Sequence, residues 1–222
     1  MTEEGREGAA EVTRESVLEA AKELLAKGLV EGTSGNVSGR LGDGTVCLTP
    51  SSVPYETMTV DDLTVCDLDG RQLEGARGPT SEKALHLACY RAHLDVGGVI
   101  HSHAVHATMF ATVRQPIPAV IEEVVVYIGG DVPVADYRTT GTDELGAEVA
   151  RHLGDRSAVL VANHGMVTIG ATPAKALHAA GVVERTAQIV WGARMLGPVH
   201  PVPEEVNANF AGVYRMMRDM GM

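Results

Sequence analysis

The segment VGGVIHSH, residues 96–103, constrains the fold most strongly, because it is a short apolar run between two helical patterns. Its length and its Val and Ile residues indicate a strand. Apolar residues at helical spacing indicate helices over residues 81–93 and 104–113 on either side. A strand between two such helices requires a sheet that helices cover, so the chain is expected to have an α/β fold.

The same patterns continue along the rest of the chain. Further helices are predicted at residues 11–28, 142–153, 173–195 and 203–219. Further strands are predicted at residues 45–50, 63–68, 122–128, 157–163 and 164–170, with Asp69-Gly70 as a hairpin turn. Helices and strands alternate without strict βαβ order, so we expect a three-layer α/β/α sandwich with a central, mainly antiparallel sheet. A single domain is expected over residues 1–222, with roughly the first ten residues disordered.

The composition excludes several classes of partner. The formal net charge of −11 opposes binding to nucleic acid or to anionic membranes, which are held mainly by Lys and Arg. No run reaches the ~18 apolar residues of a membrane span, and the acidic N-terminus lacks the apolar core of a signal peptide. Cys47, Cys66 and Cys89 lie far apart, so neither a disulfide framework nor a thiolate zinc site is indicated. We expect a soluble cytoplasmic protein without nucleic-acid or membrane partners.

His101 and His103 form an H-x-H pair at the end of the apolar strand. Side chains alternate along a strand, so both imidazoles project from one face and can chelate a metal. Two hydrogen-bonded histidines without a metal explain the pair equally well. A catalytic zinc site usually has about three protein ligands, so a further ligand is required. His164, beside Gly165 at the end of another apolar strand, is one candidate, although a surface histidine at a strand end would look the same.

Glu82 is a second candidate ligand, because it lies in the first turn of the helix that leads to the H-x-H strand. A carboxylate at that position interacts favourably with the helix dipole, so helix capping is an alternative explanation. His86 lies four residues later on the same side of the helix and is a reserve ligand. His106 follows His101 by five residues and need not face the pair, so it is a weaker candidate for substrate contact.

The stretch EGTSGNVSG, residues 31–39, combines three glycines with short hydroxyl and amide side chains. Backbone and side-chain donors in such a loop can bind phosphate oxygens without Lys or Arg. The spacing differs from that of a P-loop, and no Lys follows it. LTPSS at 48–52 and PTS at 79–81 offer further hydroxyls. A plain surface loop would have the same composition, so both interpretations stay open.

Four motifs together resemble the class II aldolase/adducin family: GTSGNVS, LTPSSVPYE, PTSEKALHLACYRAHLDVGGVIHSHAVHAT and ANHGM. The resemblance implies the α/β/α sandwich and a fourfold homotetramer with active sites between neighbouring subunits. It implies one zinc ion per chain, held by four residues: Glu82, His101, His103 and His164. It also implies a site for the phosphate group of a sugar substrate, formed by seven residues: Thr33, Gly35, Asn36, Ser51, Ser52, Thr80 and Ser81.

Three positions depart from the pattern of the family's aldolases. Ser52 stands where they carry Gly, which narrows the phosphate pocket, and Thr80 stands where they carry Ser. Those enzymes also use a tyrosine of a neighbouring subunit, after an IPA segment, to protonate the leaving aldehyde. Here Glu122 occupies about that position and Tyr127 lies further along. Tyr214 resembles a second family tyrosine near the C-terminus, and a tyrosine that packs a helix is an equal alternative.

The resemblance implies a zinc-dependent aldolase that cleaves a ketose 1-phosphate, L-fuculose 1-phosphate first, into dihydroxyacetone phosphate and L-lactaldehyde. Glu82 is expected to move the proton that completes dihydroxyacetone phosphate. Glu122 favours a second activity, dehydration or decarboxylation of a related sugar phosphate such as methylthioribulose 1-phosphate, because relatives with that chemistry use a glutamate in this segment. Glu123 has the simpler explanation of a solvated strand end. A non-catalytic, adducin-like interaction domain is a third interpretation, and the four residues able to bind metal argue against it.

Overall fold

The computed structural model describes the backbone of residues 3–221 and the side chains from residue 9; residues 1, 2 and 222 lie outside the described part. Its helices are α1 (Glu3–Ala26), α2 (Lys83–Ala92), α3 (Val105–Val113), α4 (Glu122–Ile128), α5 (Asp143–Leu153), α6 (Pro173–Leu196) and α7 (Glu204–Asp219), with a short 3-10 helix at Val60–Asp62. Its strands are β1 (Asn36–Arg40), β2 (Val46–Leu48), β3 (Thr64–Cys66), β4 (Gln72–Glu74), β5 (Gly98–Ser102), β6 (Val134–Ala135), β7 (Ala158–Val161) and β8 (Gly165–Gly170).

The strands form one sheet in the order β4-β3-β2-β1-β5-β8-β7-β6. Neighbouring strands are antiparallel, except for the parallel pair of β6 and β7. The predicted, mainly antiparallel sheet is therefore confirmed. β1 and β5 are central, and their register pairs Asn36 with His101. This pairing places the glycine-rich loop beside the end of the histidine strand.

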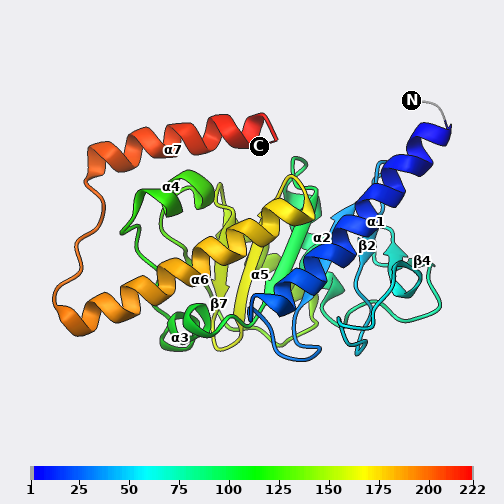
Figure 1. The fold of residues 1–222 in the computed structure, drawn as a ribbon, viewed down its shortest axis with the longest axis horizontal. Helices are drawn as coiled ribbons and strands as arrows, with labels where there is room; N and C mark the ends of the chain where they lie inside the picture. The colour runs from blue at the N-terminus through cyan, green and yellow to red at the C-terminus, as the bar shows by residue number, and fades with distance from the viewer. Residues whose placement is uncertain (1–2, 222) are drawn as a thin grey trace.

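Helices cover both faces of the sheet (Figure 1). On one face, α1, α3, α4 and α6 pack a core that includes Leu24 and Phe110. On the other face, α2 and α5 pack a second core. Side-chain alternation along β5 separates the two cores, since Ile100 belongs to the first and Val99 to the second. The three-layer α/β/α sandwich is thus confirmed, and His101, two residues after Val99, faces the α2 layer.

The segment at residues 122–128 was predicted as a strand, and this prediction is wrong because the segment forms helix α4. Its β-branched residues favour a strand by propensity. However, Val124, Val125 and Ile128 are buried, which is the spacing of one helical face. Two acidic residues lie in the first turn, and Gly129, at φ +97°, ends the helix in the left-handed region. Packing of the helical face therefore outweighs the strand propensity.

Strands β1 and β6 were not predicted. β1 has the sequence NVSGR, in which Val37 is the single large apolar residue, while Asn36 and Ser38 are buried polar residues that face α2. β6 has two residues, too few for a recognisable pattern. The N-terminal expectation also requires correction, because α1 begins at Glu3 rather than near residue 11.

The structure also locates the cysteines and the long helices. Cys47, Cys66 and Cys89 are all buried free thiols. Burial raises the pKa of Cys47 and of Cys89 to about 12, so these thiols stay protonated at neutral pH. Within residues 3–221, no helix combines the length and the apolar character needed to cross a membrane.

Candidate active site

Three histidines meet at one end of the sheet. His101 lies in β5, His103 lies two residues later, just after the strand, and His164 lies in the turn between β7 and β8. Asn163, at φ +57°, turns the chain sharply before His164. The Nε2 atoms of His101 and His103 are 3.0 Å apart, and one potential ligand atom from each of the three histidines lies within 4.8 Å of the others. The predicted common face of the H-x-H pair is therefore observed, and His164 joins it.

Glu82 points into this cluster from the start of α2. Its Oε2 lies 3.1 Å from Nε2 of His101 and accepts a hydrogen bond from Nδ2 of Asn36 at 3.0 Å. Its Oε1 lies 3.4 Å from Nε2 of His164. Glu82 is the N-cap residue rather than a first-turn residue, and its carboxylate makes no capping hydrogen bond. Helix capping therefore does not explain this carboxylate.

The geometry of these groups fits a divalent cation. The carbonyl of Met166, 3.0 Å from Nδ1 of His101, accepts a hydrogen bond from that atom, so a neutral ring would carry its lone pair on Nε2. That lone pair faces the Glu82 carboxylate. Oε1 of Glu82 is buried and has no hydrogen-bond partner among the described residues. A cation bound between Nε2 of His101 and the Glu82 carboxylate would remove the repulsion between their electron pairs. Zinc-bound histidines commonly donate their second N–H to a carbonyl, as His101 does here.

Electrostatics keep these groups in the protonation states that bind metal. Burial, together with the nearby His101, lowers the pKa of His164 to about 4. Burial also lowers the pKa of His103. For Glu82, burial raises the pKa, but the contacts with His101 and Asn36 outweigh it, and the pKa lies well below its ordinary value. At neutral pH the site therefore offers neutral imidazoles at His103 and His164 and an ionised carboxylate at Glu82, which suits zinc.

The loops predicted to bind phosphate share one cleft with this cluster. The cleft has a volume of about 220 Å³, and all seven predicted phosphate-site residues line it together with Glu82, His103 and His164. Ser51 Oγ donates a hydrogen bond to the Pro79 carbonyl at 3.0 Å and so joins the LTPSS and PTS loops. The cleft thus combines potential cation ligands with hydroxyl donors.

One lining residue was missed and one predicted residue is strained. Three more residues line the cleft: Ser34, Pro50 and Thr140. Ser34 and Pro50 belong to the loops already predicted, whereas Thr140 was missed; its sequence signal is a Gly- and Thr-rich stretch, TTGT, like the other hydroxyl loops. Ser52, which replaces a family glycine, has φ +60°, a conformation that favours glycine. Ser52 therefore departs from the family pattern at a position whose backbone conformation favours glycine.

Neither His86, the reserve ligand, nor His106, the candidate for substrate contact, belongs to the cluster. His86 is fully buried behind the cleft, where its ring contacts Ser38 and Asn36. His106 turns toward α6, where its Nδ1 lies 2.7 Å from Oε1 of Glu184. Glu184 also accepts hydrogen bonds from the backbone N–H groups of His106 and Ala107, at 3.0 and 2.9 Å. Glu184 thereby caps the start of α3, directly after the turn that holds His103.

The residues considered as aldehyde acids lie outside the cleft of their own chain. Glu122 is exposed as the first residue of α4, and Glu123 forms an ion pair with Arg185 at 3.4 Å. Tyr127 stacks edge-on against His178, with ring centroids 4.5 Å apart. Tyr214 is buried in α7. Within one chain, the structure does not bring these residues to the histidine cluster.

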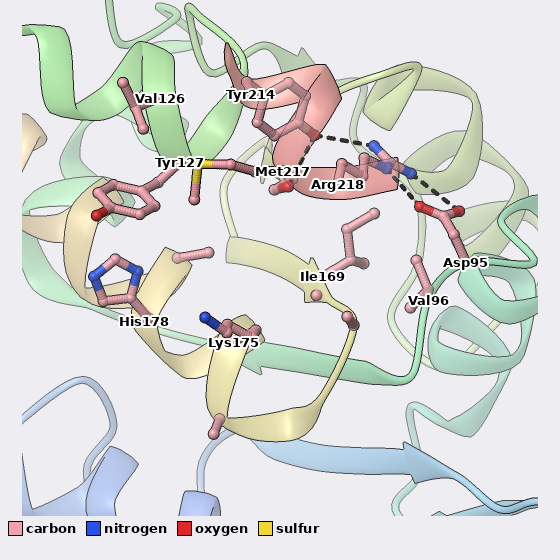
Figure 2. Close-up of a pocket in the computed structure, with 15 residues that line it drawn as sticks. Asp95, Val96, Val126, Tyr127, Ile169, Lys175, His178, Tyr214, Met217 and Arg218 are labelled. Carbon is pink, nitrogen blue, oxygen red and sulfur yellow. Dashed lines mark hydrogen bonds and ion pairs between the residues drawn. The ribbon is translucent and has the colours of Figure 1, made fainter. Parts of the chain in front are cut away.

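Tyr127 and Tyr214 instead line a second cavity, of about 350 Å³, between α4, α6 and α7 (Figure 2). The Tyr214 hydroxyl donates a hydrogen bond to the Asp155 carbonyl at 2.7 Å and lies 2.9 Å from Ser157 Oγ. Arg218 donates to the same hydroxyl at 3.0 Å and pairs with Asp95 at 2.6 Å. These contacts hold α7 against the end of the sheet that lies opposite the histidines.

Comparisons with known proteins agree with the sequence motifs. The family model described as Class II Aldolase and Adducin N-terminal domain matches residues 15–191. The L-fuculose phosphate aldolase of Escherichia coli O6:H1 is 35% identical over 206 residues, covering 93% of this chain and 94% of that protein. The L-ribulose-5-phosphate 4-epimerase UlaF of Salmonella paratyphi C is 36% identical over 204 residues, covering 86% of this chain and 90% of that protein.

One further relative and one solved structure are also similar to this chain. The 5-deoxy-D-ribulose 1-phosphate aldolase of Bacillus thuringiensis serovar kurstaki is 33% identical over 199 residues, covering 89% of this chain and 93% of that protein. Among solved structures, an L-fuculose 1-phosphate aldolase has a TM-score of 0.88 and 32% identity, covering 93% of this chain and 98% of that one. The chain therefore resembles proteins of more than one activity over nearly its full length.

Proposed function

The chain belongs to the class II aldolase and adducin family, and on this premise we propose that it is a zinc-dependent aldolase acting on a ketose 1-phosphate. L-Fuculose 1-phosphate is the proposed substrate, with dihydroxyacetone phosphate and L-lactaldehyde as products. The observation that carries the proposal is that a cluster of three imidazoles and one carboxylate adjoins a cleft lined by three hydroxyl-bearing loops. We place this activity in the cytoplasm, where buried free thiols such as those found here persist.

Zinc would be held by Glu82, His101, His103 and His164, one ion per chain, and would act as a Lewis acid on the substrate carbonyl. The hydroxyls and backbone N–H groups of the cleft would bind the phosphate and fix the position of the sugar. Cleavage of the C3–C4 bond leaves its electron pair on the dihydroxyacetone phosphate half. Glu82, whose Oε1 has no hydrogen-bond partner among the described residues, would take up a proton from solvent and transfer it to C3, which completes this product.

We assign proton transfer at the C4 oxygen to Glu122 of a neighbouring subunit in a homotetramer. Glu122 would take the proton from the C4 hydroxyl during cleavage and would return it to the aldehyde oxygen in the reverse reaction. Glu122 is exposed at the start of α4, so a second subunit can approach it. Tyr214, the other candidate, is less suited, because its hydroxyl is occupied inside its own chain. The site would then be incomplete without the partner.

A coupled assay tests the reaction. Purified protein with bound zinc is incubated with L-fuculose 1-phosphate, 5-deoxy-D-ribulose 1-phosphate and methylthioribulose 1-phosphate in turn. Any dihydroxyacetone phosphate released is reduced by an added dehydrogenase, and the loss of NADH is followed. We expect turnover with one of the first two sugars. Consumption of substrate without this product would exclude the aldolase.

The assignment of Glu122 has its own test, with the neighbouring carboxylate as control. We expect Glu122→Gln to lower kcat by about 100-fold or more. The matched variant Glu123→Gln should retain activity, because Glu123 pairs with Arg185. Assemblies reconstituted from inactive Glu122→Gln and His103→Ala chains should regain activity, since some sites receive both intact residues. No recovery in verified mixed assemblies would place the acid within one chain.

A second candidate function is supported by the similarity to a 4-epimerase at 36% identity. An epimerase of this kind would break and re-form one carbon–carbon bond without releasing the fragments. Incubation with L-ribulose 5-phosphate would then give its C4 epimer and no free aldehyde. Dehydration or decarboxylation of a related sugar phosphate is the other alternative, and loss of water or carbon dioxide would identify it by mass spectrometry.

A further inference from the structure

A buried row of polar side chains runs from the interior of the molecule to Glu82. Its members alternate between α2 and β1 and are, in spatial order, Tyr90, Ser38, His86, Asn36 and Glu82. The helix contributes a residue every fourth position, and the strand contributes every second position, so one face of each element supplies the row. We call these five residues the polar row.

Every link of the polar row is a hydrogen-bond contact between buried groups. The Tyr90 hydroxyl lies 2.9 Å from Ser38 Oγ, and Ser38 Oγ lies 2.7 Å from Nδ1 of His86. Nε2 of His86 contacts Oδ1 of Asn36, whose Nδ2 donates to Glu82 Oε2 at 3.0 Å. Tyr90, Ser38 and His86 are 0% exposed, so water does not compete for these contacts. A row that is closed to water must satisfy its own donors and acceptors.

The chemistry of the links fixes the direction of the protons. An ionised Glu82 can only accept, so the amide of Asn36 must turn its NH2 group toward Glu82 and its oxygen toward His86. That oxygen requires a proton on Nε2 of His86. Burial lowers the pKa of His86 to about 3, so the ring is neutral and has one proton. Nδ1 therefore accepts from Ser38, and Ser38 accepts from Tyr90.

We propose that His86 is a positioning residue, held as its Nε2–H form by Ser38 and Tyr90, which fixes the Asn36 amide and thereby anchors Oε2 of Glu82. The polar row leaves Oε1 of Glu82 free toward the cleft. The two carboxylate oxygens thus differ in role, one anchored and one available for ligand or proton. This assignment rests on the proposed role of Glu82 in proton transfer.

The polar row also holds α2 against β1, and a purely structural role would explain the same contacts. The two interpretations differ in what they expect of His86. A structural role needs any well-packed side chain at that position. A positioning role needs a donor directed at Asn36 and predicts an effect on turnover that exceeds the loss of stability.

The first measurement requires no substitution and no activity. A long-range proton–nitrogen NMR spectrum of the metal-free protein, labelled at histidine nitrogens, reports which ring nitrogen of His86 carries the proton. We expect Nε2 to be protonated and Nδ1 unprotonated at neutral pH. A proton on Nδ1, or two protons, would overturn the proposal whatever the enzymatic activity of the chain.

The second measurement compares three variants in the zinc-loaded protein. His86→Leu removes the donor, and we expect kcat per folded molecule to fall by about 10- to 100-fold with KM little changed. His86→Gln restores a donor toward Asn36 and should recover most of this loss. Thr186→Val is the matched control, because it removes a buried hydroxyl whose hydrogen bond lies within α6, to the Val182 carbonyl at 2.7 Å. Its kcat should equal that of the unmodified protein.

The outcomes separate this proposal from the proposed function. If the unmodified protein is active and His86→Leu turns over as fast as Thr186→Val, the positioning role is overturned and the aldolase stands. If the unmodified protein cleaves none of the sugar phosphates, the aldolase fails, and the protonation of His86 still decides the orientation of the polar row. If His86→Leu does not fold, Ser38→Ala replaces it, with a smaller loss of kcat in the same direction expected.

Discussion

Two polar clusters stand at opposite ends of the sheet, and they differ in how their groups are satisfied. Around Tyr214, the hydroxyl has three partners, and Arg218 donates to Asp95, to the Asp155 carbonyl and to Tyr214. Around Glu82, by contrast, a carboxylate oxygen and a ring nitrogen of His164 are buried without hydrogen-bond partners among the described residues. The Tyr214 hydroxyl and the Arg218 guanidinium thus find their partners within the chain, and Nε2 of His93 is the one buried atom beside them without a partner among the described residues. The second cluster requires something the chain does not supply.

This difference separates structural from functional polar groups more clearly than cavity size does. The cavity beside Tyr214 is the larger of the two, at about 350 Å³ against about 220 Å³. Buried polar groups normally find partners, so unpaired groups that converge on one point indicate a ligand. Substitutions at the Tyr214 end should therefore affect stability, and substitutions at the Glu82 end should affect binding and turnover.

The largest effect is expected at His103. His103→Ala removes one imidazole from a partly exposed position in the cleft, so the chain should fold while activity falls by more than about 100-fold and zinc affinity falls with it. Zinc content, circular dichroism and the coupled assay measure the three properties. Retained turnover would remove His103 from the mechanism.

Glu82→Gln should have the next largest effect. The amide cannot take up a proton as the carboxylate does, so kcat should fall by about 100-fold while the three histidines still hold zinc. Kinetics and metal analysis of the same sample measure both. Unchanged turnover would give Glu82 a structural role only. The functional assignment of this end of the sheet would then depend on the three histidines alone.

Arg218→Leu tests the other end of the sheet. It removes the ion pair with Asp95 and the hydrogen bonds to Asp155 and Tyr214, and we expect the free energy of unfolding to fall by about 1–3 kcal/mol. Turnover per folded molecule should be unchanged. Denaturant unfolding measures the first quantity and the coupled assay the second. A fall in turnover per folded molecule would instead support Tyr214 as the acid.

The smallest effect is a dependence of stability on pH in the metal-free protein. Burial is the largest cause that lowers the pKa of His86, from 6.5 to about 3. Below pH 6.5 the unfolded chain binds a proton that the folded chain does not, so stability is present above 6.5 and is lost as the pH falls toward 3. We expect a loss of about 1 kcal/mol per pH unit from this group. Urea unfolding from about pH 7 to about pH 5 checks the slope, and His86→Gln should reduce it.

The fold was largely predictable because its signals are local. The apolar run before His101 and the helical spacings on both sides of it lie within about 30 consecutive residues, the length of one supersecondary unit. Segment 122–128 was mispredicted because its three valines favour a strand, whereas the burial of Val124, Val125 and Ile128 depends on packing against other helices. Tertiary contacts of this kind are not visible in a short window of sequence.

The candidate site was predicted from its motifs, and its supporting contacts were not. The motif resemblance named Glu82, and the structure then showed that its carboxylate reaches the histidines rather than capping α2. His86 was considered as a reserve ligand because of its spacing from Glu82, yet it contacts Asn36 and Ser38 instead. The β1 partners of α2 come from 46 to 52 residues earlier in the chain, so spacing along the helix cannot reveal them.

The cap that Glu184 places on α3 sets an order of events during synthesis. Glu184 lies 78 residues after His106, whose N–H it binds, so the turn that carries His103 lacks its cap until the ribosome has passed the middle of α6. All four potential metal ligands emerge from the ribosome before that point. A growing chain therefore presents all four potential ligands before the cap at the start of α3 can form.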